Sequence, residues 1–345
     1  MISKNNVTKA LSVLVLAGQC NIALSDNESL AKESIAVKDG KTSSEKNVES
    51  LFSKSGNNYS LIKKGEFQGG LSVEYSNFEQ VQQTSVILDN NFTMLDLSLD
   101  SERVINTTFD IDYGLTSNVT ASISIPSSIK SNELEGLTVA GVGDLQLSLR
   151  WQPLPSNAGG LTAITFMSVS IDTGTSPYEI TAGEDLATGN GHKGLSVGMS
   201  VFKSFDPLMG FASFSYTHNA DIKDINQERV FFSEAGMVQG ELTEIETGDS
   251  FSATFGLTYA ITYDFSLSGQ YQHSITNKSK FIWTSVDADN TTYSSSTDSA
   301  IFDNNLVKFT ASWKGDDSSY TNLYLLLPLT DGQPAAVVGV ALSVF

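Results

Sequence analysis

The sequence has little cysteine, little histidine and few bases, and each scarcity excludes a class of protein. Its single cysteine, Cys20, lies in an N-terminal segment that we expect to be removed, so the mature chain has neither a disulfide framework nor a thiol nucleophile. Three histidines are too few for most catalytic schemes. Because 20 basic residues stand against 39 acidic ones, we predict no nucleic-acid partner.

Long apolar runs are also missing beyond the N-terminus. No stretch approaches the ~18 consecutive apolar residues that a membrane-spanning helix needs. A chain of this kind is either a soluble exported domain or a closed barrel that crosses a membrane with strands. Composition does not separate the two, because 40% apolar residues with abundant Gly, Ser and Thr suits both.

The N-terminal segment MISKNNVTKALSVLVLAGQCNIALS, residues 1–25, is typical of a signal peptide. Lys4 and Lys9 precede an apolar run, and Ala23 and Ser25 have the small-x-small spacing of a cleavage site. We therefore expect export by the general secretory route. Cleavage takes the formal net charge from −19 to about −21. Lipidation of Cys20 is the alternative, although Gln19 occupies a position where such proteins have a small residue.

Residues 26–68 are polar and lack sustained alternation, which predicts a periplasmic leader. Val48, Leu51 and Phe52 have the i, i+3, i+4 spacing of a short amphipathic helix that would lie at the mouth of a barrel as a plug. A disordered spacer fits the composition equally well.

The stretch FSATFGLTYAITYDFSLSGQYQHS, residues 251–274, alternates large apolar residues with Ser, Thr and Gln. Successive side chains of a strand point to opposite faces, so this ribbon contacts an apolar medium on one side and water on the other. A soluble β-sandwich would give the same alternation over about five or six residues per strand. These runs extend over about ten residues, the length of a tilted membrane-crossing strand.

Similar alternation recurs along residues 69–345 and predicts an all-β, transmembrane antiparallel β-barrel of about 12 strands. The expected strands are residues 70–75, 103–113, 119–125, 141–152, 161–172, 194–205, 208–217, 251–263, 265–276, 305–314, 320–329 and 335–345. Long connections at 76–102, 126–140, 173–193, 218–250 and 277–304 alternate with short turns. Outer-membrane barrels have this pattern, with the long loops outside the cell.

Aromatic residues near the expected strand ends suit the level of the lipid headgroups. They are Tyr113, Trp151, Phe202, Phe205, Tyr216, Tyr259, Tyr263, Phe265, Trp313 and Tyr320. The final strand ends at Phe345, which resembles the C-terminal signal read by the outer-membrane insertion machinery. Ser343 stands where that signal usually has an aromatic residue.

Two enzyme hypotheses fit the sequence poorly, and we predict that the protein is not an enzyme. A phospholipase would need a serine on the same face as His273, where Ile275 is the next same-face residue. Asp172, Thr173 and Gly174 match an aspartic-protease motif, but it occurs once, and a turn is the simpler interpretation. No cofactor and no metal site is predicted.

Charged and amide residues on the polar phase of the strands are the candidate pore-lining residues. They are Glu74, Asp110, Asp112, Asp144, Arg150, Gln270, Lys308 and Lys314. Such groups either line a water-filled pore and set its solute preference, or pair with one another across a plugged lumen.

Several segments, in this order, resemble the "MetA-pathway of phenol degradation" family of outer-membrane barrels. They are SLIKKGEFQGGLSVEYSN, YGLTSNVTASISIP, GVGDLQLSLRWQ, SIDTGTSPYEI with ATGNG, and FKSFDPLMGFASFSYTHN. The likeness covers residues 61–276, and Asp172 stands where the family commonly has proline.

The resemblance implies a channel in the outer membrane of a Gram-negative envelope for passive transport of small, often aromatic or hydrophobic, solutes. A second branch of the family is similar to the trimeric export pores of functional-amyloid systems, so a homotrimer that exports a polypeptide is the first alternative. A structural or adhesive barrel with acidic surface loops is the second. The expected surroundings are outer-membrane lipid and lipopolysaccharide.

Overall fold

The computed structural model divides the chain into two units, residues 1–42 and residues 43–345, and only the second contains described residues. The described residues are 61–88, 92–132, 136–154, 160–180, 185–205, 207–233, 236–286, 292–315, 319–330, 334 and 336–344. The predicted signal peptide and the predicted helix around Leu51 lie outside them. No helix in these ranges is long and apolar enough to cross a membrane.

The described residues form strands β1 to β17. Their bounds are β1 Phe67–Leu88, β2 Phe92–Thr116, β3 Val119–Asn132, β4 Leu137–Val142, β5 Leu145–Trp151, β6 Leu161–Ile171, β7 Gly194–Phe205, β8 Leu208–Asn219, β9 Ile222–Ser233, β10 Gly236–Glu246, β11 Ser250–Ala260, β12 Phe265–Thr276, β13 Lys280–Val286, β14 Thr292–Asp298, β15 Phe302–Lys314, β16 Tyr320–Pro328 and β17 Val337–Val344.

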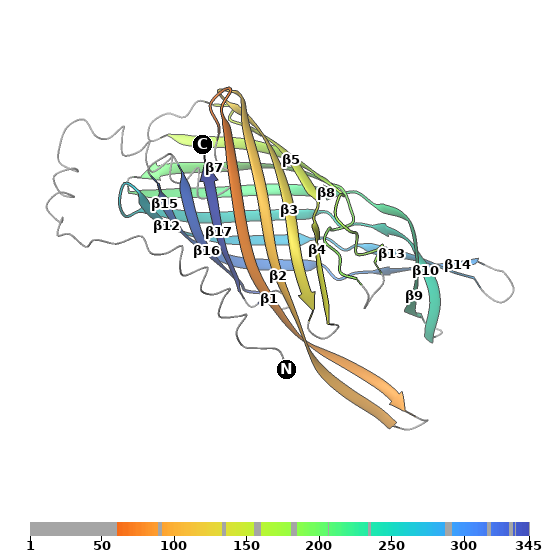
Figure 1. The fold of residues 1–345 in the computed structure, drawn as a ribbon. Coiled ribbons are helices and arrows are strands. Elements are labelled where there is room, and N and C mark those ends of the chain that lie inside the picture. Colours follow the sequence, from red (N-terminus) through yellow and green to blue (C-terminus); the bar gives the residue numbers. More distant parts are fainter. Residues whose placement is uncertain are drawn as a thin grey trace, which may run out of the picture. The chain divides into compact units, whose positions relative to one another are not determined.

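Twelve of these strands close into an antiparallel barrel, as the sequence predicts (Figure 1). The order around the wall is β1, β2, β3, β5, β6, β7, β8, β11, β12, β15, β16 and β17. The ring closes where residues 69–76 of β1 pair with residues 337–344 of β17. Closure leaves the wall without an open edge, which is the condition for strands to cross a bilayer.

The alternation seen in the sequence is the alternation of the two faces of the wall. In β11, Phe251, Phe255 and Leu257 are exposed on the outside, whereas Thr254 and Thr258 are buried inside. The same phase recurs around the ring, with apolar side chains outside and Ser, Thr and Gln facing the lumen. A soluble protein has the opposite arrangement. Apolar side chains outside and polar side chains inside are what a barrel surrounded by lipid requires.

One end of the barrel carries short turns and the other carries long connections. We call them the short-turn end, where β2 joins β3, β5 joins β6, β7 joins β8, β11 joins β12 and β15 joins β16, and the long-loop end. The first residue of β1 and the last residues of β17 both lie at the short-turn end, because Gly69 pairs with Val344. These positions agree with the predicted turns.

Four of the predicted long loops are wrong, because they consist largely of strands. Residues 76–102 are the far parts of β1 and β2, and residues 126–140 hold the end of β3 and most of β4. Residues 218–250 contain β9 and β10, and residues 277–304 contain β13 and β14. In the first of these segments LDLSLD, residues 95–100, alternates strictly and indicates a strand; elsewhere the alternation is interrupted, since beyond the membrane neither face needs to be continuously apolar.

The far parts of β1 and β2 form a two-stranded arm that extends from the long-loop end (Figure 1). The two strands pair from Phe67 with Tyr113 through Leu88 with Phe92. Pairing of β1 with β17 stops at Ser76, and pairing of β2 with β3 stops at Glu102.

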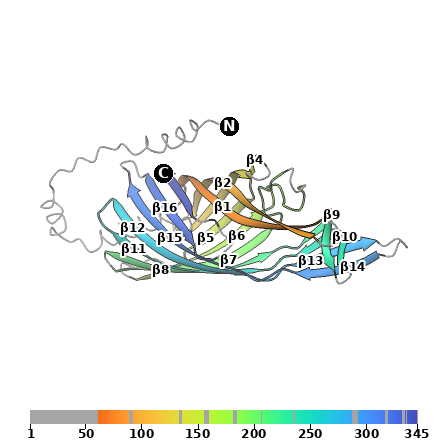
Figure 2. The ribbon, with the colours of Figure 1, turned by 90° about the horizontal axis from the view of Figure 1, so that it is seen from below.

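Strands β9, β10, β13 and β14 form a separate four-stranded sheet, which we call the outer sheet. Figures 1 and 2 both show it beyond the long-loop end of the barrel. Its own apolar cluster consists of Ile225, Leu242 and Ile245. The outer sheet continues four neighbouring wall strands, β8, β11, β12 and β15, in the same order.

Aromatic rings gather at the short-turn end of the outer face, partly as predicted. Phe67 lies 4.4 Å from Tyr113 and Phe265 lies 5.1 Å from Trp313, measured between ring centroids. Phe202 and Tyr320 are corrections to the predicted aromatic belt, because they are buried at 5% and 2% exposure. Phe202 packs inside the barrel, since it falls on the inward phase of β7.

The end of the predicted leader enters the barrel at the short-turn end. The backbone N–H of Ile62 donates to Oγ1 of Thr120, an inward-facing residue, over 2.9 Å, and Ile62 is 3% exposed. Leu61 packs against an inward apolar cluster of Ile164, Phe202, Met209 and Phe211. The wall strand then begins at Phe67, three residues earlier than predicted.

The two faces of β7 should tolerate a cation very differently. Met199 is an exposed residue near the middle of the strand on the outer face, and Ser196 lines the lumen. Met199→Arg should lower the free energy of unfolding from lipid by about 2–4 kcal/mol because it places a charge in hydrocarbon. Ser196→Arg is the matched control and should change it by less than about 1 kcal/mol. Urea titration in liposomes measures both, and equal costs would contradict the assignment of faces.

Candidate functional site

The barrel encloses a cavity of about 640 Å³ lined by inward residues of the wall strands. Hydroxyl and amide side chains make up most of the lining, among them Ser72, Ser122, Ser148, Ser196, Ser213, Ser252, Thr254, Gln270 and Gln272. Each lies on the polar phase of its strand, which is why the lining is uniform in chemistry. The cavity is therefore a polar space inside an apolar shell.

Seven of the eight predicted pore-lining residues border this cavity. They are Glu74, Asp110, Asp112, Asp144, Arg150, Gln270 and Lys308. Lys314 is not among the lining residues, and its Nζ lies 4.8 Å from the ring centroid of Tyr263. Lys314 is the last residue of β15. It lies on the inward phase of the strand, as predicted, but too close to the short-turn end to line the cavity.

Arg150 on β5 lies at the centre of the first charged cluster. Its Nη2 lies 2.5 Å from Oδ1 of Asp112 on β2 and 2.6 Å from the hydroxyl of Ser122 on β3. Arg150 is 3% exposed. Strand order β2, β3, β5 and a shared inward phase bring the three residues together.

Two serines of β3 complete this cluster. The Ser122 hydroxyl donates to Asp112, and the Ser124 hydroxyl donates to Asp110. Register explains both contacts, because Ser122 pairs with Asp112 and Ser124 pairs with Asp110 across the two strands. Carboxylates on β2 thus have hydroxyl donors fixed opposite them on β3.

A second charged cluster spans β15, β16 and β1. Nζ of Lys308 lies 4.2 Å from the ring centroid of Tyr324, and the Tyr324 hydroxyl donates to Oε1 of Glu74 over 2.8 Å. The intervening strand β17 has Gly339 between Tyr324 and Glu74. A Cβ at Gly339 would collide with the Tyr324 ring, so glycine is what lets the tyrosine reach across.

Asp144 has a different role from the other acids, which sequence reasoning missed. One carboxylate oxygen accepts the N–H of Gly174 over 3.1 Å, and the other accepts the N–H of Asn190 over 2.6 Å. Both donors belong to the connection from β6 to β7. Asp144 thus attaches this connection to the wall at the interruption between β4 and β5, where Pro126 lies opposite on β3.

The Asp172-Thr173-Gly174 motif is part of the same attachment. The Thr173 hydroxyl donates to the carbonyl of Gly143 over 2.9 Å and accepts the N–H of Leu145 over 2.9 Å. These bonds satisfy backbone groups where the β4–β5 break leaves them without a strand partner. The turn interpretation of the motif agrees with these contacts.

The lining charges are unequal in sign. Glu74, Asp110, Asp112 and Asp144 face the cavity with two cations, Arg150 and Lys308. An acidic lining in a narrow apolar shell attracts cations and repels anions.

Two histidines lie on the outer face, each held by an oxygen of a neighbouring segment. Nδ1 of His218 on β8 lies 2.8 Å from Asp249, and Nδ1 of His273 on β12 lies 2.8 Å from Oδ1 of Asn305. His218 was expected in a loop, but it belongs to β8 because that strand extends to Asn219. The absence of an enzyme activity stays a prediction.

The comparisons with known proteins agree with the fold. No family model matches the chain, so the sequence resemblance remains a prediction. The crystal structure of the COG4313 outer membrane channel from Pseudomonas putida F1 is similar at a TM-score of 0.58 and 14% identity, covering 84% of this chain and 98% of that chain. The P. putida toluene transporter TodX aligns at a TM-score of 0.40 and 12% identity, over 82% and 90% of the two chains, which is too low to argue from.

Taken with the geometry, the likeness shows that the chain has the fold of an outer-membrane β-barrel. At this identity the likeness speaks for the fold alone. What the barrel transports has to be argued from its own lumen.

The Arg150 cluster gives a test of coupling inside the lumen. Asp112→Asn should lower the free energy of unfolding by about 3 kcal/mol, because Arg150 stays buried without its closest counter-charge. Adding Arg150→Met to that variant should recover most of the loss, since the buried guanidinium is removed as well and Asp110 keeps the hydroxyl of Ser124. Urea midpoints of the two single variants and the double variant measure the coupling. Strictly additive effects would contradict it.

Proposed function

We propose that the protein is a passive channel for small solutes in the outer membrane, with a preference for cations. The observation that carries the proposal is a polar cavity inside a closed wall, lined by built charged clusters with an excess of carboxylates. Nothing in this arrangement couples to an energy source, so solutes would move down their gradients.

The size of the passage supports small solutes over an exported polypeptide. Inside the short-turn end, Leu61 packs against the apolar cluster of Ile164, Phe202, Met209 and Phe211 on the inner face of the wall, and the N–H of Ile62 donates to Thr120. By the rule for such barrels this is the periplasmic end. A chain in transit would have to displace these residues, whereas water-sized and drug-sized solutes are on the scale of a 640 Å³ cavity.

The lining also refines the solute class that the resemblance implies. Serine, threonine and glutamine dominate the cavity walls, with Phe166 and Tyr324 as the aromatic members. Such a lining suits solutes that carry hydroxyl or amino groups, including those with an aromatic ring, better than plain hydrocarbons. We therefore propose small polar or amphipathic solutes, with cationic ones favoured.

Planar-bilayer recording tests the channel directly. Purified full-length mature protein should give stepwise conductance, and a KCl gradient should give a reversal potential of the sign that cation preference requires. Arg150→Gln should shift that potential further toward cations, because it removes one of the two lumen cations. Lys203→Gln, on the outer face of β7, is the control and should leave it unchanged.

A silent barrel at high protein density would contradict the channel and favour a structural or adhesive role. Anion preference would contradict the role assigned to the acidic lining. Liposome swelling with aromatic amines, neutral sugars and aromatic acids would then rank the solutes, with the amines expected to enter fastest.

A further inference from the structure

We propose that the outer sheet is a hinged lid that swings as one body about a crease at the long-loop end and is held closed by Tyr178. This inference rests on the proposed channel function, since a lid regulates access to a passage. The argument has three parts: an interruption common to four strands, the free edges of the sheet beyond it, and one apolar contact that holds the sheet down.

The crease is an interruption at the same level in four neighbouring strands. Residues 220–221 separate β8 from β9, residues 247–249 separate β10 from β11, residues 277–279 separate β12 from β13, and residues 299–301 separate β14 from β15. The order of the strands is the same on both sides, so the outer sheet is the barrel wall continued past a break. An interruption shared by four strands is a line about which a sheet can bend.

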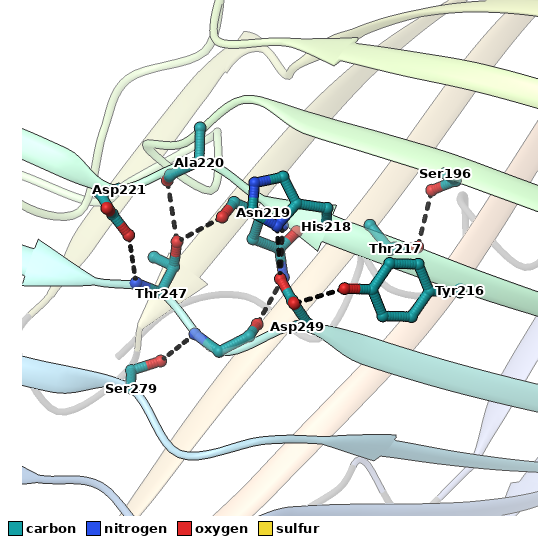
Figure 3. Close-up of polar contacts among 11 residues, drawn as sticks. Ser196, Tyr216, Thr217, His218, Asn219, Ala220, Asp221, Thr247, Asp249 and Ser279 are labelled. Carbon is teal, nitrogen blue, oxygen red and sulfur yellow. Dashed lines mark hydrogen bonds and ion pairs between the residues drawn. The ribbon is translucent and has the colours of Figure 1, made fainter.

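Along this line, side-chain hydrogen bonds (Figure 3) supplement a sparse set of backbone bonds, from the N–H of Asn277 to the carbonyl of Asp249 and from the N–H of Ser299 to the carbonyl of Ser279. Asn219 Nδ2 donates to the carbonyl of Gly248 over 2.7 Å, and the Thr247 hydroxyl donates to the carbonyl of Ala220 over 2.8 Å. The N–H of Gly248 donates to the hydroxyl of Ser279 over 3.0 Å. A Cβ at Gly248 would collide with the carbonyl of Asn277, so the close approach of these segments depends on glycine.

Asp249 fixes the barrel side of the crease. Its carboxylate accepts the Tyr216 hydroxyl over 2.5 Å and lies 2.8 Å from Nδ1 of His218, as Figure 3 shows. Together with the N–H of Asn219, these donors hold the pKa of Asp249 below its usual range, the Tyr216 hydroxyl most strongly. The carboxylate therefore stays ionised and anchors β11 to β8 directly below the bend.

Beyond the crease the sheet is free at both sides. Within the described residues, β9 and β14 are its edges and pair only with β10 and β13 respectively. The neighbouring wall strands end at or before the crease, because β7 begins at Gly194, paired with Asn219, and β16 ends at Pro328, paired with Leu306. The outer sheet is thus joined to the wall only along the crease, as far as strand pairing is concerned.

One contact ties the sheet to the loop at the mouth. The apolar cluster of Ile225, Leu242 and Ile245 is joined by Phe281 and Trp283 of β13 and by Tyr178. Tyr178 belongs to a turn in which its N–H donates to the Ser176 hydroxyl over 3.2 Å. The same connection reaches the cavity through Gly174 and Asn190, both bonded to the lumen-lining Asp144.

The position of the lid is therefore linked to the lumen. Lifting the outer sheet removes the apolar cover from Tyr178, while Asp144 keeps the nearby backbone attached to the wall. Tyr178 makes the contact with the outer sheet, and Asp144 makes the contact with the wall. Each contact can therefore be removed by its own substitution.

Cysteine labelling tests the lid without relying on transport. In a Cys20→Ser background, Ile245→Cys places a thiol inside the sheet cluster, at a position that is 1% exposed. Adding Tyr178→Ala should speed labelling by a membrane-impermeant maleimide about tenfold, because opening no longer has to break that contact. Tyr178→Phe keeps the ring and should label at nearly the parent rate.

Ile164→Cys, inside the barrel and 2% exposed, is the control for general loosening. Its labelling rate should not respond to Tyr178→Ala. An unchanged labelling rate of Ile245→Cys would contradict the lid proposal. Faster labelling of both thiols would contradict it too, because the whole barrel would then have loosened.

Bilayer recording of the same variants separates the lid from the channel. With the expected labelling, Tyr178→Ala should lengthen open times about tenfold, as the lid spends more time raised. Unchanged open times would overturn the regulatory role. A barrel that never conducts would refute the channel, whereas the labelling pattern would still decide whether the sheet swings.

Discussion

Every feature of this molecule depends on one constraint, namely that no backbone N–H or C=O of the wall can face hydrocarbon without a partner. The wall meets it by closing, with β1 paired to β17. Where pairing fails inside the wall, side chains substitute for it. Thr173 does so at the break between β4 and β5, and Asn219, Thr247 and Ser279 add to the remaining backbone bonds at the crease.

Closure also decides where charge is placed. With one face committed to lipid, each polar residue of the alternating pattern faces the lumen, and register then selects which of them meet. Asp112, Ser122 and Arg150 meet because their strands are adjacent and in phase, and Glu74 meets Tyr324 because Gly339 leaves room. Strand register therefore determines which charged residues meet. The ion pair with Asp112 explains why Arg150 is tolerated at 3% exposure.

Much of the wall could be predicted from the sequence, because period-two alternation reports the two media directly. The number of wall strands and the inward phase of the seven cavity-lining residues follow from that alternation. The outer sheet and the β1–β2 arm were expected to be loops, since outside the membrane a strand need not keep the continuous alternation that marks the wall. The attachment through Asp144 was equally hidden, because Gly174 and Asn190 bond through backbone N–H groups that no side-chain pattern records.

The pairing of β1 with β17 has a consequence for the order of assembly. Residues 69–76 are among the first of the wall to be made, yet their partner is residues 337–344. Until that strand is available, the incomplete wall exposes two unpaired strand edges, and such edges pair readily with other chains. A chain truncated before β17 therefore cannot close the barrel.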